Sequence, residues 1–492
     1  MSKGIVAAGH PLTAEAGARV LREGGNAVDA AVAAMLTSWV AEPLLTGPGA
    51  GGYLLVAGAG EEPTLLDFFV AAPSAPAGGR ERAALVPIEV DFGDALQTFN
   101  VGAAACGVPG NPAGVAEAAR RWGTIPLADL AARPAALARE GVTVNEGQAF
   151  IFDLLAGILT STPEACALFA PGGRVLAAGD VFRSTELGDA IERLGADGAA
   201  PFYTGDVAAT IAAWVAEHGG TLGAGDLAAY APVAREPVRA TYRGRDVLTN
   251  PPPNAGGVLL ALALQRLDAV EGPPRLVDVV DAMEAAQDER TPEFTTGLAD
   301  EAFASRFVAG RLGSTTHISV MDAGGLAASV TCTNGEGAAV VVPGTGVHLN
   351  NIMGEEDLSP LGFHRAPPGT RMPSMMAPTV VLRDGELELA LGSAGSNRIR
   401  SAILQTIVGV VDHGLGARAA VEAPRVHFED GAVYTEPGVP VEELRAAGRE
   451  ELVRFRDHNV FFGGVQAVER DVRTGTLTGA GDPRRGGAAV AA

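Results

Sequence analysis

The chain has 492 residues, a length that suggests about three domains. Because 47% of its residues are hydrophobic and only 19% are charged, it can bury a large core. The formal net charge of −22 argues against a nucleic acid or an anionic membrane as partner. The three cysteines, Cys106, Cys166 and Cys332, lack CxxC spacing, which indicates neither a disulfide framework nor a zinc site. The histidines form no metal-ligand motif either, so no metal and no other cofactor is expected.

The N-terminal region predicts a strand over 3–8 and two helices. Thr13 is expected to cap a helix that ends near Gly24, and residues 27–40 predict a second, buried helix. His10 and Pro11 interrupt the first residues too early for a secretory signal. The apolar part of the second helix is too short to cross a bilayer, so a cytoplasmic protein is predicted.

A glycine-rich stretch follows the second predicted helix. Gly47, Gly49 and Gly52 fit the spacing GxGxxG of nucleotide-binding loops. That motif needs a strand before it and a helix after it, whereas here a helix precedes and a strand follows. We therefore interpret these glycines as allowing a sharp turn and close backbone approach.

The middle of the chain predicts two paired strands, 52–57 and 63–70, a loop to about Val86, and a helix ending near Trp122. Helical patterns then dominate as far as about Leu298, with a structureless linker predicted over 290–313. The helices expected there are 127–140, 146–160, 184–195, 206–217 and 257–270.

The pattern becomes β from Thr315 onwards. Strands 315–322 and 326–333 flank a Gly-Gly turn and predict a hairpin, and the Gly/Ala tail 486–492 looks like low-complexity sequence. Alternating helices and a largely antiparallel β core predict an α+β fold, a four-layer αββα sandwich. The other strands expected are 346–349, 379–383, 387–391, 461–468 and 477–480, with β-like sequence over 423–435 and helices over 397–412, 416–422 and 441–448.

Thr315 is the first candidate catalytic residue. It follows the small residues Gly313 and Ser314 and begins an alternating β-branched run. If the chain cuts itself between Ser314 and Thr315, the freed α-amine, with a pKa of about 7.7–8.0, can act as base for the threonine hydroxyl. Without such a cut, Thr315 is simply the first residue of a strand.

Two further stretches could complete such a site. Thr333 ends the second hairpin strand, and pairing about the turn would bring it opposite Thr315. The alternative is that Thr333 is simply a β-branched strand residue. Gly395 and Ser396 lie between a predicted strand and a predicted helix, where backbone N–H groups can stabilise an oxyanion or simply begin a capped helix. The acidic run Glu355, Glu356 and Asp357 could hold a substrate ammonium group or form a solvated turn.

Taken together, these motifs resemble the γ-glutamyltransferase (γ-glutamyltranspeptidase) family of N-terminal-nucleophile hydrolases over nearly the whole length. The segments that carry the resemblance are 24–31, 42–43, 46–52, 107–110, 251–253, 256–257, 315–320, 349–351, 377–379 and 392–395.

The resemblance implies self-cleavage into a large chain, 1–314, and a small chain, 315–492, which stay together as a heterodimer or a higher oligomer. It implies Thr315 as nucleophile, Thr333 as the second threonine 18 residues on, and the backbone amides of Gly395 and Ser396 as the oxyanion site. Asn334 lies next to the position of the family's substrate-binding asparagine, which by strict count is Gly335.

Two positions depart from the family's substrate-binding pattern. Ser374 matches one of two family serines that hold the substrate carboxylate, but Pro373 replaces the other. Phe69 aligns with the arginine that grips the γ-glutamyl carboxylate, and a phenyl ring cannot form those bidentate hydrogen bonds. The acidic residue that holds the substrate ammonium could be any of Glu355, Glu356 and Asp357.

The main hypothesis is therefore a self-processing threonine amidohydrolase or acyltransferase that cleaves γ-glutamyl amides such as glutathione. Because of Phe69, a related acylase acting on glutaryl or other short dicarboxylic acyl amides remains an alternative. A non-catalytic relative that serves as a binding protein is a third possibility. In the first two hypotheses the partner is a small amide or peptide.

Overall fold

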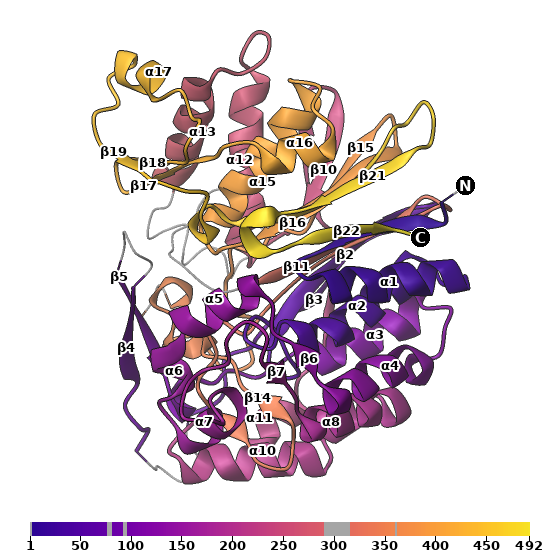
Figure 1. The fold of residues 1–492 in the computed structure, drawn as a ribbon, viewed down its shortest axis with the longest axis vertical. Helices are drawn as coiled ribbons and strands as arrows, with labels where there is room; N and C mark the ends of the chain where they lie inside the picture. The colour runs from indigo at the N-terminus through magenta and orange to yellow at the C-terminus, as the bar shows by residue number, and fades with distance from the viewer. Residues whose placement is uncertain (1, 76–80, 92–95, 290–314, 360–361) are drawn as a thin grey trace.

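The described residues, 2–75, 81–91, 96–289, 315–359 and 362–492, form two β-sheets that lie face to face in the computed structural model. Helices cover the outer face of each sheet, which gives the predicted order of layers, helix, sheet, sheet, helix (Figure 1). The segment 290–314, which includes the predicted linker and Ser314, lies outside the described residues.

The first sheet has seven strands, all antiparallel to their neighbours, and the hairpin that follows Thr315 lies in its centre. Its order is β22 (Ala488–Ala491), β1 (Gly4–Ala8), β11 (Thr316–Asp322), β12 (Leu326–Thr333), β2 (Gly51–Gly58), β3 (Glu61–Phe68) and β8 (Val233–Arg235).

The second sheet has six strands and is likewise antiparallel. Its β16 and β20 pack on β11 of the first sheet. Its order is β21 (Leu477–Gly481), β20 (Gly464–Arg470), β16 (Glu386–Ala394), β15 (Thr379–Arg383), β10 (Arg245–Thr249) and β9 (Val238–Tyr242).

Residues before and after position 315 contribute strands to both sheets, so the two predicted chains are interleaved. The C-terminal β22 pairs with the N-terminal β1, β1 pairs with β11 on its other side, and both β1 and β22 contact β21 (Figure 1). A cut before Thr315 would therefore leave two chains that share both sheets and both large hydrophobic cores.

The helices form the two outer layers. On the first sheet lie α1 (Pro11–Glu23), α2 (Ala27–Ala41) and α3 (Asn111–Trp122), with α4 (Leu127–Glu140) and α8 (Thr185–Asp197) behind them. On the second sheet lie α12 (Ala255–Asp268), α15 (Arg398–Val411) and α16 (Ala417–Glu422), with α13 (Leu276–Asp288) against α12.

The remaining helices and strands have at most nine residues, except α10, which has 12. They are α5 (Glu146–Leu154), α6 (Ala156–Leu159), α7 (Pro163–Phe169), α9 (Ala200–Tyr203), α10 (Asp206–Glu217), α11 (Ala224–Ala228), α17 (Val441–Ala446), β4 (Val86–Asp91), β5 (Leu96–Val101), β6 (Val142–Thr143), β7 (Val181–Phe182), β13 (Val341–Val342), β14 (Val347–His348), β17 (Val426–Glu429), β18 (Ala432–Thr435) and β19 (Leu452–Arg454).

Helix α2 shows how the sequence builds the layer behind the central strands. Asn26 caps it by accepting hydrogen bonds from the N–H groups of Val28 and Asp29, and the Asp29 carboxylate accepts one from the Asn26 N–H. All fifteen of its residues are buried, because it is covered by α1, α3 and α4 as well as by the sheet.

Several sequence predictions need correction. Helix α1 begins at Pro11 with His10 as its cap, because Thr13 donates to Glu42 instead. The helical stretch 146–160 is split at Leu155. Strands β8, β9 and β10 interrupt the region predicted as helical, and the β4–β5 hairpin was not predicted. The tail read as low complexity forms β22.

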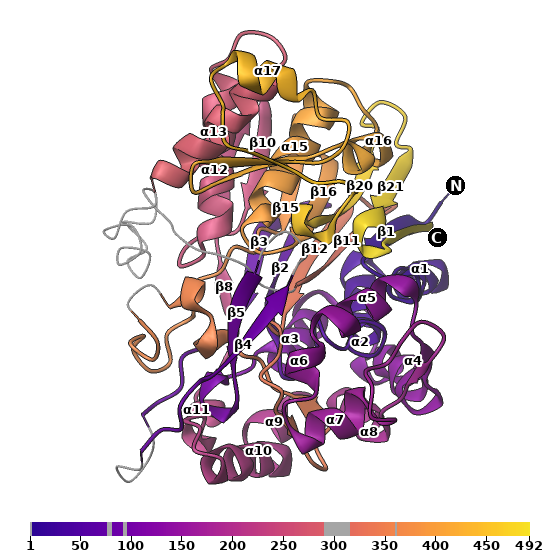
Figure 2. The ribbon, with the colours of Figure 1, turned by 60° about the vertical axis from the view of Figure 1, so that its left-hand side comes forward.

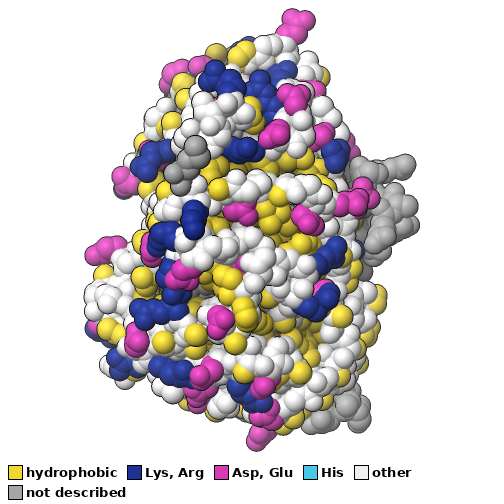
Figure 3. Space-filling view, turned by 90° about the vertical axis from the view of Figure 1, so that its right-hand side faces the viewer, with side chains coloured by type: hydrophobic (Ala, Val, Ile, Leu, Met, Phe, Trp, Pro, Cys, Tyr) yellow, Lys and Arg dark blue, Asp and Glu magenta, His cyan; other side chains and the backbone are white. Residues whose placement is uncertain are grey.

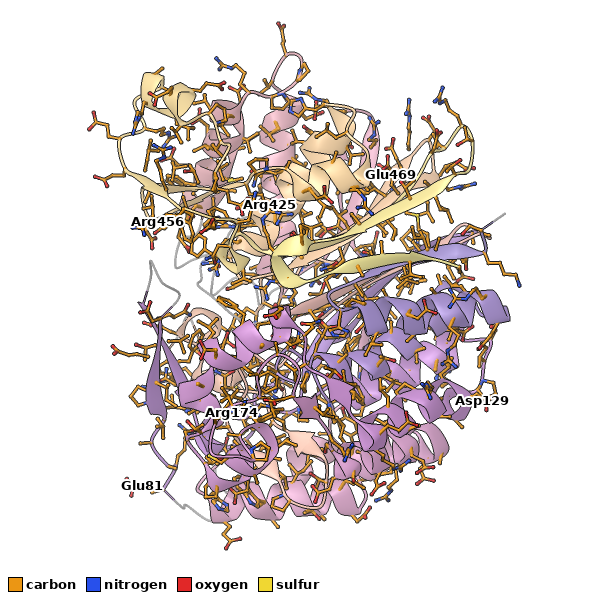
Figure 4. All side chains as sticks on the ribbon, viewed as in Figure 1. Glu81, Asp129, Arg174, Arg425, Arg456 and Glu469 are labelled. Atoms are coloured by element: carbon orange, nitrogen blue, oxygen red, sulfur yellow. The ribbon has the colours of Figure 1, made fainter. Side chains whose placement is uncertain are left out.

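Charge is distributed mostly on the outside. Acidic and basic side chains are interspersed on the face shown in Figure 3. An exception is Arg425, which lies inside the half of the molecule built on the second sheet (Figure 4) and pairs with Asp482 at 2.7 Å. No helix among the described residues is long and apolar enough to cross a membrane.

Candidate active site

Strand pairing places four site positions in one row across the first sheet. Thr316 pairs with Cys332, Thr333 with Gly51, and Gly52 with Phe68. Moving one residue along the strands from the first and third of these pairs puts Thr315 opposite Thr333 and Gly51 opposite Phe69. We call the four positions Thr315, Thr333, Gly51 and Phe69 the nucleophile row. The strands that carry it are neighbours in the order β11, β12, β2, β3 (Figure 2). At about 4.8 Å per strand, Thr315 and Phe69 lie about 14 Å apart.

The nucleophile row faces the second sheet. Thr316 points to the helix layer, where its hydroxyl donates to Glu42 Oε2 at 2.6 Å, so Thr315 points the other way. Phe69 belongs to the core between the two sheets. Gly51, between Thr333 and Phe69, contributes no side chain, and a Cβ there would lie 2.7 Å from the Val70 nitrogen.

The two threonines are buried, and the register that pairs Thr316 with Cys332, extended by one residue, puts Thr315 opposite Thr333. Thr333 Oγ1 accepts a hydrogen bond from the Gly335 N–H at 2.9 Å. This bond fixes the Thr333 side chain at the head of the loop that leaves β12. A hydroxyl held in this way next to Thr315 has the placement required to orient a nucleophile.

Of the three acidic residues considered from the sequence, Glu355 approaches this loop. A Cβ on Gly335 would lie 2.3 Å from Glu355 Oε1 and 2.0 Å from Asn351 Oδ1, so both side chains pack against the Gly335 backbone. Glu355 is buried, whereas Glu356 is exposed; the side chain of Asp357 lies outside the description.

Asn334 is buried beside His348. Its Nδ2 lies 3.3 Å from His348 Nδ1, and burial lowers the pKa of His348 to about 4, so the ring is neutral. Asn334 Oδ1 has no hydrogen-bond partner among the described residues. That buried acceptor would gain a partner from a substrate N–H group.

Gly395 and Ser396 form the turn between β16 and α15, as predicted. Both have positive φ, 108° and 53°, and for Ser396 this is a strained conformation. A Cβ on Gly395 would lie 2.9 Å from the Gly463 Cα, so the turn packs closely on its neighbour. The N-terminal N–H groups of the 14-residue α15 follow at once, which makes the turn suitable for stabilising an anion.

His317 connects the nucleophile strand to the second sheet and was not singled out from the sequence. Its Nδ1 lies 2.8 Å from Thr331 Oγ1 and its Nε2 2.9 Å from Ser319 Oγ. Ser319 donates in turn to the Gln466 carbonyl at 3.1 Å, and the ring covers Gly392, where a Cβ would be 2.2 Å away. Burial lowers the pKa of His317 to about 3, so it is a neutral structural group.

Glu42, directly after α2, is a second residue whose role was not predicted, although it belongs to a segment that carries the family resemblance. It is fully buried and accepts hydrogen bonds from Thr13 at 2.8 Å and from Thr316. Burial raises its pKa to about 6, although the hydroxyls and the charge of Arg485 act in the opposite direction. Glu42 therefore anchors the residue directly after Thr315.

At the positions where the family binds the substrate carboxylate, the side chains of this protein make other contacts. Phe69 is fully buried and stacks on Tyr53 with ring centroids 5.5 Å apart, so its ring is part of the core. Ser374 is buried, and its Oγ accepts from the Met376 N–H at 3.0 Å. Pro373 lines a cavity of about 1100 Å³ that also adjoins Met353.

No group of three or more His, Cys, Asp or Glu side chains is placed to hold a metal ion within the part of the chain that the structure describes. The polar groups of the site are instead hydroxyls, amides and backbone N–H groups. These are the groups that nucleophilic attack on a carbonyl requires.

Comparison with known proteins agrees with this geometry. The sequence model of the family described as gamma-glutamyltranspeptidase matches residues 13–311 and 293–492. The chain is 33% identical to the acylase ACY 1 proenzyme of Pseudomonas sp. (strain SE83), covering 100% of this chain and 94% of the relative. It is 30% identical to the glutathione hydrolase proenzyme of Bacillus subtilis (strain 168), covering 99% and 91%.

Among solved structures, the cephalosporin acylase from Bacillus halodurans superposes with a TM-score of 0.83 at 28% identity. The match covers 99% of this chain and 96% of that one. The αββα architecture is thus shared along the full described chain.

Proposed function

The chain belongs to the γ-glutamyltranspeptidase family of N-terminal-nucleophile hydrolases, and from this premise we propose that it is a self-processing threonine acylase. The observation that carries the proposal is the position of Thr315. It lies at the head of a central strand, beside Thr333, in a layer packed against the strand that leads to the Gly395 turn.

Maturation begins at the bond between Ser314 and Thr315. The Thr315 hydroxyl attacks the Ser314 carbonyl, and the acyl group moves from nitrogen to oxygen. Water then hydrolyses the ester, leaving a carboxylate on Ser314 and a free amine and hydroxyl on Thr315. Because both products contribute strands to both sheets, they remain together as a heterodimer.

Turnover uses the same hydroxyl. The free amine accepts the Thr315 proton as the hydroxyl attacks the substrate amide. The N–H groups of Gly395 and Ser396 stabilise the oxyanion, and the amine then protonates the leaving nitrogen. Water or an acceptor amine releases the acyl group. Thr333 orients the nucleophile, and Asn334 offers its unpartnered Oδ1 to a substrate N–H.

We propose an acyl group that lacks the α-amino group of γ-glutamyl but keeps its terminal carboxylate, for example glutaryl. The support for this choice is the similarity to proteins named acylases. The ring of Phe69 fills the core at the position where the family places its carboxylate-binding arginine, so we propose that the carboxylate is not bound at position 69. Leaving a charged carboxylate there without its partner would cost roughly 2–5 kcal/mol.

γ-Glutamyl amides such as glutathione are the second candidate. Buried Glu355, against the Gly335 backbone, is placed to hold a substrate ammonium group, and relatives at 30% identity bear the name glutathione hydrolase. Both candidate substrates would be attacked by Thr315. They differ in the α-amino group, which only the γ-glutamyl group carries.

Two measurements test the proposal. Denaturing electrophoresis should show two fragments in place of a 49.9 kDa band, and an uncut band after long incubation would favour the non-catalytic alternative. Hydrolysis of glutaryl and γ-glutamyl anilides should then be compared. Faster hydrolysis of the glutaryl compound is expected, and a clear preference for γ-glutamyl would make the second candidate the correct one.

A further inference from the structure

The turn formed by Gly395 and Ser396 has to be held in a strained shape. Ser396 has a φ of 53°, which a residue with a side chain keeps only where its surroundings enforce it. On one side the turn packs closely on Gly463. On the other side it continues into Asn397, which is fully buried. The contacts of Asn397 therefore influence where the N–H groups of the turn point.

A single side chain attaches Asn397 to the neighbouring strand β17. Its Nδ2 donates to Glu429 Oε1, and its Oδ1 has no hydrogen-bond partner among the described residues. Glu429 is thus the only side-chain partner of Asn397 in the part of the protein that the structure describes. Removing the Glu429 carboxylate would release the Asn397 side chain.

Glu429 belongs to a chain of hydrogen bonds that returns to α15. His427 Nε2 lies 3.3 Å from Glu429 Oε2, and His427 Nδ1 lies 2.9 Å from Ser401 Oγ. Ser401 follows Asn397 by four residues, so both lie on the same side of the helix. Strand β17 therefore holds α15 at its N-cap residue, Asn397, and again one turn further on.

The charge of Glu429 sets the direction of these bonds. Burial opposes ionisation, but the hydrogen bond from His427 and the charges of Arg398 and Arg400 lower the pKa of Glu429 to about 2. A carboxylate only accepts, so His427 carries a proton on Nε2. Burial lowers the pKa of His427 to about 4, so the ring is neutral and its Nδ1 accepts from the Ser401 hydroxyl. One arrangement of protons therefore satisfies the whole chain of bonds.

Ser401, His427 and Glu429 also have the bonding order of a hydrolytic Ser–His–acid triad. Such a triad needs access for a substrate, but Ser401 is 2% exposed and His427 is 0% exposed. The void beside Ser401 measures about 10 Å³, which leaves room for one water molecule at most. These three residues therefore link β17 to α15 and do not form a second hydrolytic site.

We propose that Glu429, supported by His427 and Ser401, is a positioning residue that acts through Asn397 on the N–H groups of the Gly395 turn. The inference rests on the proposed acylase function and extends it to residues that do not touch the substrate. Donors aimed at the oxyanion stabilise the transition state more than the bound substrate. Loss of the link should therefore lower kcat and leave KM close to its wild-type value, whereas a residue that only stabilised the fold would change neither constant of the folded enzyme.

The test uses whichever anilide, glutaryl or γ-glutamyl, the wild type hydrolyses faster. Glu429→Ala frees Asn397, so kcat should fall about 10- to 100-fold, the range for misplaced oxyanion donors. Glu429→Gln keeps an acceptor for Asn397 and, once His427 changes tautomer, a donor for its Nε2, so most of kcat should return. The matched control is exposed Glu450, which lies just before β19 in the sheet that contains β17. Glu450→Ala should leave both constants unchanged.

Inhibition by a boronic acid with the same acyl chain gives a second measurement. The Thr315 oxygen donates an electron pair to boron while its proton passes to the free amine, which produces a tetrahedral anion at the site of the oxyanion. Glu429→Ala should weaken this inhibition by about the factor lost in kcat. Inhibition by the free acid product, which carries no tetrahedral centre, should not change.

The outcomes separate this inference from the acylase function. A wild type that neither cuts itself nor hydrolyses either anilide overturns both. If the wild type is active, the positioning role alone is wrong when Glu429→Ala keeps its kcat, when the loss appears in KM, or when Glu429→Gln is as slow as Glu429→Ala. Should Glu429→Ala not fold, Asn397→Ala gives the same decision, because it removes the link and leaves the bonds between Glu429, His427 and Ser401 in place.

Discussion

Two adjacent rows on the same face of the first sheet differ in their residues and in the purposes we assign to them. The supporting row, two residues further along each strand and about 7 Å away, consists of His317, Thr331, Tyr53 and Asp67. In it, His317 and Asp67 each bond two other side chains. The nucleophile row instead contains Gly51, where a Cβ would lie 2.7 Å from the Val70 nitrogen, so backbone occupies the place of a side chain.

The difference shows how the protein separates rigidity from chemistry. Hydrogen bonds in the supporting row join neighbouring strands and, through Ser319, the two sheets. They hold the sheet that carries Thr315 against the sheet whose β16 leads to the Gly395 turn. The supporting row thus stabilises the sheets directly beside the residues proposed for the chemistry.

The largest effect is expected in the nucleophile row. Thr315→Ala removes both the attacking hydroxyl of cleavage and the nucleophile of turnover, so a single uncut chain and a loss of activity of at least about 10³-fold are expected. Thr315→Ser keeps the hydroxyl and should still cut. Electrophoresis and anilide hydrolysis measure the two outcomes. Efficient cleavage of the alanine variant would show that another residue is the nucleophile.

The supporting row should respond in stability first. His317→Ala leaves the Thr331 hydroxyl without its partner and opens a void over Gly392, which should lower the free energy of unfolding by ~2–4 kcal/mol. Chemical denaturation of the variant checks the value. Exposed His413→Ala is the matched control and should stay within about 0.5 kcal/mol of the wild type. Equal stability of both variants would show that His317 does not stabilise the sheets.

The hairpin was predictable because its alternating pattern and Gly-Gly turn are local, and they set the register that brings Thr315 to Thr333. The turn at Gly395 was predictable for the same reason. The roles of His317 and Glu42 were not, because the contact of the His317 ring with Gly392 on β16 and the bonds of Glu42 to Thr13 and Thr316 form only when the layers pack. Strand β22 was missed because its Gly/Ala sequence carries no pattern and its pairing with β1 spans nearly the whole chain.

A smaller, pH-dependent effect is expected at Glu42, which lies behind the nucleophile row. Burial raises its pKa from 4.5 to about 6, so the folded state favours the protonated carboxyl. The associated stability is fully present below about pH 4.5 and is lost as the pH rises through 6. At about 1.4 kcal/mol per pKa unit this amounts to ~2 kcal/mol.

Glu42→Gln removes that titration. The difference in free energy of unfolding between the wild type and this variant should therefore change by ~2 kcal/mol between pH 4 and pH 7, in the direction that favours the variant at pH 7. Urea denaturation at several pH values measures it. A difference that is independent of pH would mean that Glu42 titrates normally.

The smallest effect is expected at the far end of the nucleophile row. Phe69→Leu removes the ring that stacks on Tyr53 but keeps an apolar side chain, so we expect a loss of only about 1–1.5 kcal/mol in stability. The ratio of glutaryl to γ-glutamyl anilide hydrolysis should stay unchanged, because the ring is part of the core. Thermal unfolding and the two anilide rates test both points. A shift in that ratio would show that Phe69 touches the substrate. Both ends of the nucleophile row would then act on the substrate, Thr315 as nucleophile and Phe69 as a binding residue.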